Sequence, residues 1–282
     1  MKTIISFSGG KTSAYMTWLL IQQTENKEDL VVLFANTGQE HPKTLEFINK
    51  CDELLGFNTI WLEAVVHHDQ RVACTHRVTN YKKCDKKGDV FEEVIKKYGL
   101  PNKSYKHCNR ELKINPIESY RKAQKLRDAK MAIGIRADEI DRVSLAAMTT
   151  RKVFYPLADA GKTQEDVNQF WRNQTFTLDI PDYMGNCVTC FKKSNRKLLT
   201  IADDEPKWFD FTARMEKLYN HVGSNREEGR AFYRGHKTTL DVLNEASEPF
   251  TRYKPDAQMT FDLYYDQGGG CGSSCEVYAD ED

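Results

Sequence analysis

Short apolar runs alternate with helical patterns along the first half of the chain. The run from Leu30 to Ala35 is continuously apolar, as in strands that are buried on both faces of a sheet. Strands are predicted at residues 4–7, 30–35, 59–62 and 131–135, and helices at residues 14–20 and 42–55. This alternation predicts a doubly wound, mostly parallel α/β sheet, in which ligands bind at the carboxyl ends of the strands.

The pattern changes between and after these elements. Residues 65–130 form a long segment inserted between the third and fourth predicted strands. Helices are predicted within it at 90–98 and 116–126, and a further helix is predicted at 163–172. The last third of the chain is polar and aromatic, and its pattern assigns no element.

Composition places the chain among globular proteins. Its 282 residues are 40% hydrophobic, with 41 Lys and Arg against 41 Asp and Glu, which permits a sizeable core and excludes collagen-like and disordered classes. No apolar run approaches the roughly 18 to 20 residues that a membrane helix needs, and the N-terminal run breaks too early for a signal peptide. We therefore expect a soluble, cytoplasmic protein without a membrane partner.

The zero net charge conceals an uneven distribution. Residues 71–130 hold 17 Lys and Arg against 7 Asp and Glu, a net charge of +10, and residues 241–282 have a net charge of −8. A basic segment favours an anionic ligand, and nucleic acid is one candidate because backbone phosphates attract clustered lysines. The alternative is two solvated faces of opposite sign that attract each other.

The turn after the first predicted strand has the composition of a phosphate-binding loop. Gly9 and Gly10 let the backbone approach an anion closely, and the amides at the start of the next helix point at it. A Walker loop would require a glycine where Ile5 stands, so the ordinary nucleoside-triphosphatase loop is disfavoured. The candidate nucleotide ligands in this loop are Ser8, Gly9, Gly10, Lys11, Thr12 and Ser13.

The loop resembles the nucleotide loop of the phosphoadenosine phosphosulfate (PAPS) reductase family, within the adenine nucleotide alpha-hydrolase-like, or PP-loop, superfamily. Thr12 and Asn36 stand where that group carries acids. Other segments are similar to family segments in the same order along residues 4–200, and the last of them resembles a proline-containing strand. These segments are Asn36-Thr37-Gly38, Cys108 to Lys113, Gly134 to Glu139 with Arg142, and Tyr155-Pro156-Leu157.

The resemblance implies a PP-loop nucleotide-binding domain at residues 1–182, with the basic segment 65–130 inserted, and a cysteine-containing C-terminal region at 183–282. It implies an adenine nucleotide, ATP or PAPS, as the bound cofactor or substrate. Asn36, Thr37 and Gly38 would hold its base and ribose, and Gly134 and Arg136 would complete the site.

Three cations are candidates for holding the reacting anion. Arg136 and Arg142, at the carboxyl end of a strand, would give bidentate contacts to a sulfate or phosphate. The alternative is ion pairing with the neighbouring acids at 138, 139 and 141. Lys113 would supply a second contact to the anion. The alternative is that Lys113 is a solvated lysine on a helix.

Eight cysteines in a chain without an export signal are interpreted as thiols, metal ligands or redox groups. Cys187 and Cys190 form a C-x-x-C pair, and Cys108 follows Lys106 and His107, whose positive charge would lower its thiol pKa. We predict that these three cysteines converge on one metal centre. Cys275 is the preferred fourth ligand, and Cys84 is the other candidate.

The identity of this centre and the reaction are left open by the residues. Some members of the wider family carry a four-iron, four-sulfur cluster near the nucleotide, so we favour an iron–sulfur cluster (4Fe-4S) over structural zinc, with metal-free thiols as a third alternative. Cys271-Gly272 is loosely similar to the mobile Cys-Gly segment with which the reductases attack activated sulfate. Cys271 is thus a candidate catalytic residue, although the usual flanking Glu and His are absent.

Two reactions are implied by the resemblance. One is reduction of an adenylylated sulfate, with a thiol or ferredoxin-type electron donor; the other is ATP activation of an oxygen for sulfur insertion, for which nucleic acid would be one acceptor. A non-catalytic, zinc-stabilised nucleotide-binding protein is the remaining alternative, favoured by the replacement of acids at Thr12 and Asn36.

Overall fold

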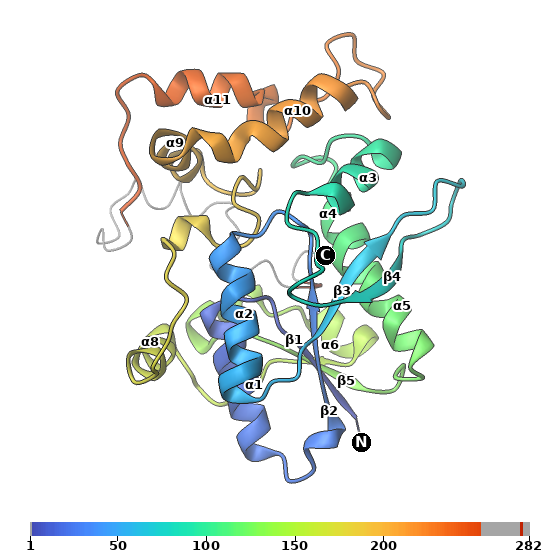
Figure 1. The fold of residues 1–282 in the computed structure, drawn as a ribbon, viewed down its shortest axis with the longest axis vertical. Helices are drawn as coiled ribbons and strands as arrows, with labels where there is room; N and C mark the ends of the chain where they lie inside the picture. Colours follow the sequence, from blue (N-terminus) through green and yellow to red (C-terminus); the bar gives the residue numbers. More distant parts are fainter. Residues whose placement is uncertain (1, 255–276, 279–282) are drawn as a thin grey trace.

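Six strands form one sheet at the centre of the computed structural model, which describes residues 2–254, 277 and 278 (Figure 1). The strand order reverses at β1, which pairs in parallel with both β2 and β5, and ligands of open α/β sheets bind at such a reversal. The predicted doubly wound, mostly parallel sheet is confirmed. Across the sheet the strands are β4 (Thr75–Thr79), β3 (Ile60–Val65), β2 (Leu30–Ala35), β1 (Thr3–Ser6), β5 (Lys130–Ile133) and β6 (Val153–Phe154), with only the β3–β4 pair antiparallel.

Helices cover both faces of the sheet because successive strand side chains point to opposite sides. Ile5 packs with helices α1 (Lys11–Gln23), α2 (Pro42–Leu55) and α8 (Gln164–Arg172) on one face. Its neighbour Ile4 packs on the other face with α5 (Asn115–Ala123) and α6 (Leu145–Arg151). Each fully buried Ile or Leu of these clusters contributes about 1.5 to 3 kcal/mol relative to an exposed side chain.

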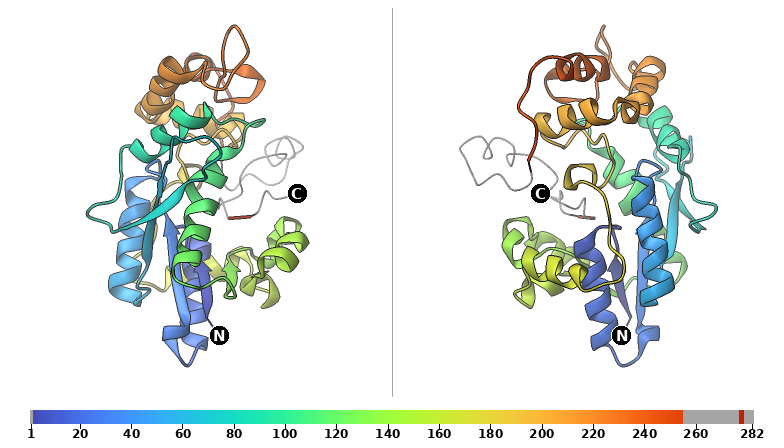
Figure 2. Two further views of the ribbon diagram at one scale, coloured as in Figure 1. Left: turned by 90° about the vertical axis from the view of Figure 1, so that its right-hand side faces the viewer. Right: turned by 60° about the vertical axis from the view of Figure 1, so that its left-hand side comes forward.

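A helical lobe lies beyond the carboxyl ends of the strands (Figures 1 and 2). The inserted segment contributes α3 (Asp89–Tyr98) and α4 (His107–Asn109), which share one hydrophobic cluster with residues of the C-terminal region. The described part of the last third of the chain, to which the pattern assigned no element, has three α-helices. It contains α9 (Asn195–Asp204), α10 (Asp210–Tyr219) and α11 (Thr239–Ala246).

The remaining elements are short. The predicted strand at Tyr155-Pro156-Leu157 is wrong, because Pro156 begins helix α7 (Pro156–Asp159), where a missing N–H is tolerated.

No described helix has the length and apolar character of a membrane span. The division of the chain at residue 182 stays a prediction. The short helices are η1 (Lys27–Asp29), η3 (Ala137–Arg142), η4 (Asp182–Met184), η5 (Pro206–Phe209) and η6 (Arg234–His236).

A π-helical segment, η2 (Arg110–Ile114), joins α4 to α5. The amide of Asn115 donates to the carbonyl of Arg110, five residues back rather than four. Pro116 follows immediately, and its ring lacks an N–H and crowds the carbonyl four residues before it. Widening the preceding turn relieves that crowding, and such π segments often occur at functional sites.

Gly9 allows the turn between β1 and α1 to pack against α2. Its φ of +82° lies in the left-handed region, and a Cβ there would lie 2.9 Å from both Ile48 Cδ1 and Thr44 Cγ2. Gly56, at the end of α2, has a similar φ of +68° but no atom within 4 Å of an added Cβ. A side chain at Gly56 would therefore meet only backbone strain, whereas one at Gly9 would meet both backbone strain and steric contact with α2.

Gly9→Ala is expected to destabilise the protein more than Gly56→Ala. The exposed control should cost about 1 kcal/mol, from left-handed strain alone. Gly9→Ala should cost about 2 to 4 kcal/mol, because overpacking against α2 adds to the strain. Urea unfolding of both variants measures the difference, and equal losses would contradict the close packing of Gly9.

Candidate functional site

The phosphate loop is held by hydroxyl contacts among its own residues. Ser8 and Ser13 lie 2.8 Å apart through their Oγ atoms, and Ser13 Oγ also donates to the carbonyl of Gly10 at 3.1 Å. Gly10 is the N-cap of α1, and within the described residues no side chain caps this helix. The first amides of the 13-residue helix thus combine with the positive end of its dipole, an arrangement that fits a phosphate.

The loop after β2 is fixed by the buried carboxylate of Glu40. Its oxygens accept hydrogen bonds from the amide of Thr37 at 3.1 and 3.3 Å and from the Thr37 hydroxyl at 2.8 Å. The Thr37 hydroxyl also lies 3.4 Å from the Cys187 thiol. In addition, Glu40 and Cys187 form an antiparallel β-bridge, and the amide of Val188 donates to the carbonyl of Gln39. The predicted nucleotide loop and the loop of the cysteine pair are therefore one connected unit.

Asn36 is fully buried and faces the inserted segment. Its amide nitrogen donates to Glu63 Oε1 at 2.7 Å and to the carbonyl of Asp85 at 2.8 Å. The side-chain oxygen of Asn36 accepts from the amide of Gly38 at 3.3 Å. Glu63 Oε2 also accepts two hydrogen bonds from Arg77. An acid at position 36 would abut the Glu63 carboxylate, which explains why an amide stands there.

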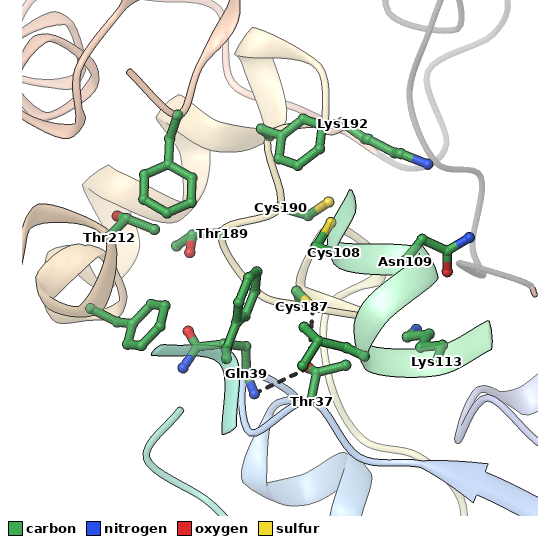
Figure 3. A pocket seen from close by; sticks show the side chains of 15 residues that line it. Thr37, Gln39, Cys108, Asn109, Lys113, Cys187, Thr189, Cys190, Lys192 and Thr212 are labelled. Atoms are coloured by element: carbon green, nitrogen blue, oxygen red, sulfur yellow. Dashed lines mark hydrogen bonds between the residues drawn. The ribbon is translucent and has the colours of Figure 1, made fainter. Parts of the chain in front are cut away.

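Cys108, Cys187 and Cys190 line one pocket (Figure 3). The helix that carries Cys108 and the loop that carries the cysteine pair face each other across it. Thr37 and Lys113 line the same pocket. The remaining wall is largely apolar and comes mainly from the helical lobe, with Phe91, Leu112, Phe191, Phe211 and Phe232.

Neither fourth-ligand candidate completes a metal site in the described part of the chain. Cys275 and Cys271 lie outside the described residues. Cys84 is buried away from the pocket, where its thiol donates to the carbonyl of Tyr81, and burial raises its pKa to about 11. Among the residues described, no group of three or more His, Cys, Asp or Glu side chains is arranged to hold a metal ion. The metal centre thus stays a prediction.

Arg136 lies against the phosphate loop and is almost fully buried. Its guanidinium donates to the Thr12 hydroxyl at 3.2 Å and forms ion pairs with Asp138 at 3.0 Å and Glu139 at 3.2 Å. Arg142 also pairs with Glu139, so the structure contains the ion pairs that the sequence left open as the alternative. Gly134 has a packing role, because an added Cβ would lie 3.1 Å from Ser13 Cα.

Lys113 is not a solvated helix lysine. It is 8% exposed, lies in the π-helical segment η2 and lines the cysteine pocket beside Asn109. The expectation that His107 supplies positive charge to Cys108 is wrong. Burial lowers the pKa of His107 to about 4, so the imidazole is neutral at pH 7. Its Nε2 donates a hydrogen bond to the carbonyl of Gly99.

Two buried acids that organise the site were not among the predicted residues. Glu40 follows Thr37 at the Thr-x-x-Glu spacing of a capping box, and that spacing was the available signal. Glu63 is an acid within the apolar strand β3, and a charge at such a position requires partners. Both carboxylates accept hydrogen bonds from the loop after β2.

Asn36→Asp is expected to destabilise the protein at neutral pH, because it replaces the 2.7 Å hydrogen bond to Glu63 with two facing carboxylates. The cost should be about 3 kcal/mol near pH 8. The neighbouring Glu63 carboxylate raises the pKa of the introduced carboxyl in the folded state. This carboxyl therefore takes up a proton as the pH falls, and the loss of stability shrinks toward about pH 5.

Asn49→Asp is the matched control, since Asn49 donates to Glu53 at 2.8 Å on the surface. Solvent screening should limit its cost to less than about 1 kcal/mol at either pH. Urea unfolding at the two pH values measures both variants. An Asn36→Asp protein as stable as the wild type near pH 8 would show that Asn36 does not face a charged Glu63.

Comparison with known proteins gives matches along the whole chain. The chain is 29% identical over 290 residues to the uncharacterized nin region protein ORF290 of Escherichia phage lambda, covering 99% of this chain and 96% of that protein. It is 32% identical over 122 residues to the uncharacterized protein MJ0973 of Methanocaldococcus jannaschii, covering 43% of this chain and 23% of that protein.

Residues 2–87 match the phosphoadenosine phosphosulfate reductase domain. This segment contains the phosphate loop, the loop after β2 and the buried acids Glu40 and Glu63. The resemblance predicted from the sequence is therefore confirmed for residues 2–87, which are similar to the PAPS reductase domain.

Proposed function

We propose that the protein is an enzyme that binds an adenine nucleotide across the loops after β1, β2 and β5 and acts on it beside a cysteine centre. The observation that carries this proposal is the junction between the two sites. Thr37, in the predicted nucleotide loop, hydrogen-bonds with the Cys187 thiol and lines the pocket of all three cysteines. A nucleotide held by this loop would have its reacting end close to the thiols.

The charged residues take distinct roles in this proposal. The amides of the first turn of α1 bind the phosphates, and Lys11 adds a positive charge. Arg136 reaches the same turn through Thr12, and Glu139 holds its guanidinium in place. Lys113, buried in the cysteine pocket, neutralises the reacting sulfate or phosphate group.

The cysteine centre is proposed to be a four-iron, four-sulfur cluster bound by Cys108, Cys187, Cys190 and Cys275. Convergence of the first three on one pocket supports a shared ligand, and the apolar wall would limit solvent access to it. When bound, such a cluster would donate electrons or ligate sulfur next to the nucleotide. Zinc remains the competing ligand for the same thiols.

Anaerobically purified protein is expected to be brown and to contain iron and acid-labile sulfide. Cys187→Ala and Cys190→Ala should each lose most of the iron, because each removes one of four ligands. Cys51→Ala is the control, since Cys51 is buried in the core between α2 and the sheet and should leave the iron content unchanged. Stoichiometric zinc without sulfide would overturn the cluster.

The reaction is tested by supplying both nucleotides to the anaerobic protein. A PAPS reductase should release sulfite from PAPS when given a thiol or reduced ferredoxin, and Cys271→Ser should abolish the release. An ATP-activating enzyme should instead convert ATP to AMP and pyrophosphate, with Cys271→Ser still active. Wild-type protein that binds neither nucleotide would refute the proposed function.

A further inference from the structure

The turn between β4 and α3 displays four exposed lysines within six residues. These are Lys82, Lys83, Lys86 and Lys87, here called the lysine turn. None of the four forms an ion pair with a described residue, whereas many other surface lysines do. Lys86 lies over the ring of Tyr81, at 4.2 Å from its centroid. Like charges this close in sequence repel one another, and a bound polyanion would relieve that repulsion.

The backbone of the lysine turn is fixed at both ends. Asn80 Oδ1 accepts hydrogen bonds from the amides of Lys82 and Lys83 at 3.0 and 3.1 Å. Asp85 accepts from the amides of Lys87, Gly88 and Val90 at 2.8 to 3.1 Å. The ammonium groups therefore extend from a preorganised loop, which lowers the entropic cost of binding a ligand.

The lysine turn is attached to the predicted nucleotide loop. The carbonyl of Asp85 accepts from Asn36, and the amide of Asp85 donates to the buried Glu63 at 2.6 Å. Gly38 packs so closely on the turn that an added Cβ would lie 2.3 Å from Asp85 Oδ2 and 2.9 Å from Gly88 Cα. The backbone of the lysine turn is thus joined to the predicted nucleotide loop.

We propose that the lysine turn binds the phosphate backbone of a nucleic acid and that this strand is the acceptor substrate, an inference that rests on the proposed function. A backbone offers a row of phosphates, which matches several separate ammonium groups better than one small anion does. DNA and RNA share this chemistry, and the experiment separates them.

The test compares two variants of equal charge change. In one, Lys82, Lys83, Lys86 and Lys87 are all replaced by Gln. In the control, four exposed lysines at the opposite end of the sheet are replaced by Gln: Lys27, Lys122, Lys125 and Lys130. Thermal unfolding confirms that both fold. Fluorescence anisotropy then measures binding to labelled DNA and RNA single strands of about 30 nucleotides over a salt series.

The lysine-turn variant is expected to bind at least about tenfold more weakly than the wild type at low salt, with the log–log salt slope reduced by about 2 to 3. The control should stay within about twofold of the wild type. The strand type that binds more tightly identifies the acceptor class. An equal loss in the control, or an unchanged slope, would overturn the proposal.

A polyglutamate competitor separates nucleic acid from an acidic protein partner. If polyglutamate binds as tightly as the oligonucleotide and with the same dependence on the lysine turn, the partner is an acidic protein and the inference is wrong. ATP titration of the same samples distinguishes this failure from failure of the proposed function. The lysine turn contains none of the proposed nucleotide ligands, so both variants should bind ATP as the wild type does.

Discussion

The buried carboxylate of Glu40 is the contact on which the proposed site depends. The carboxylate accepts hydrogen bonds from both the amide and the hydroxyl of Thr37. The backbone of Glu40 also forms a β-bridge with Cys187. A buried carboxylate is tolerated only when its oxygens are hydrogen-bonded, so the loop after β2 must keep this shape for the protein to fold. The same constraint holds the cysteine loop against the carboxyl ends of the strands. Glu40 therefore joins the two loops of the site, through its side chain on one and its backbone on the other.

Glu63 plays the corresponding role for the inserted segment. Its carboxylate is fully buried, and it accepts from Asn36, from the amide of Asp85 and from Arg77. Desolvation of this charge is expensive, and the cost is offset only while all of these donors remain in place. The turn at Asp85 consequently belongs to the core around the nucleotide loop, although residues 65–130 interrupt the parallel sheet in sequence. An insertion that is attached in this way can position a substrate.

The sequence predicted the parts of the fold that local patterns determine. The apolar run Leu30–Ala35 is a strand over its whole length, and the helix predicted at 42–55 has the bounds of α2, where Pro42 and Gly56 mark the two ends. Cys108, Cys187 and Cys190 line one pocket, as predicted, whereas the metal centre itself stays a prediction. Edge strand β4 was missed because it is half exposed, and helices α9, α10 and α11 because their core joins residues far apart in the chain. Contacts of this kind, like the neutral state of His107, depend on tertiary burial that no local pattern encodes.

Aromatic residues of the helical lobe form one wall of the pocket that contains the three cysteines. Phe91 comes from the inserted segment and Phe211 and Phe232 from the C-terminal region, yet all three pack in or against one cluster and line the pocket. Cys108, Cys187 and Cys190 are themselves partly exposed, so these aromatic side chains form an apolar wall beside the thiols without burying them fully. Thr37 lines the same pocket from the loop after β2. Thr37 therefore connects the hydrogen bonds of the loop after β2 to the wall of the cysteine pocket.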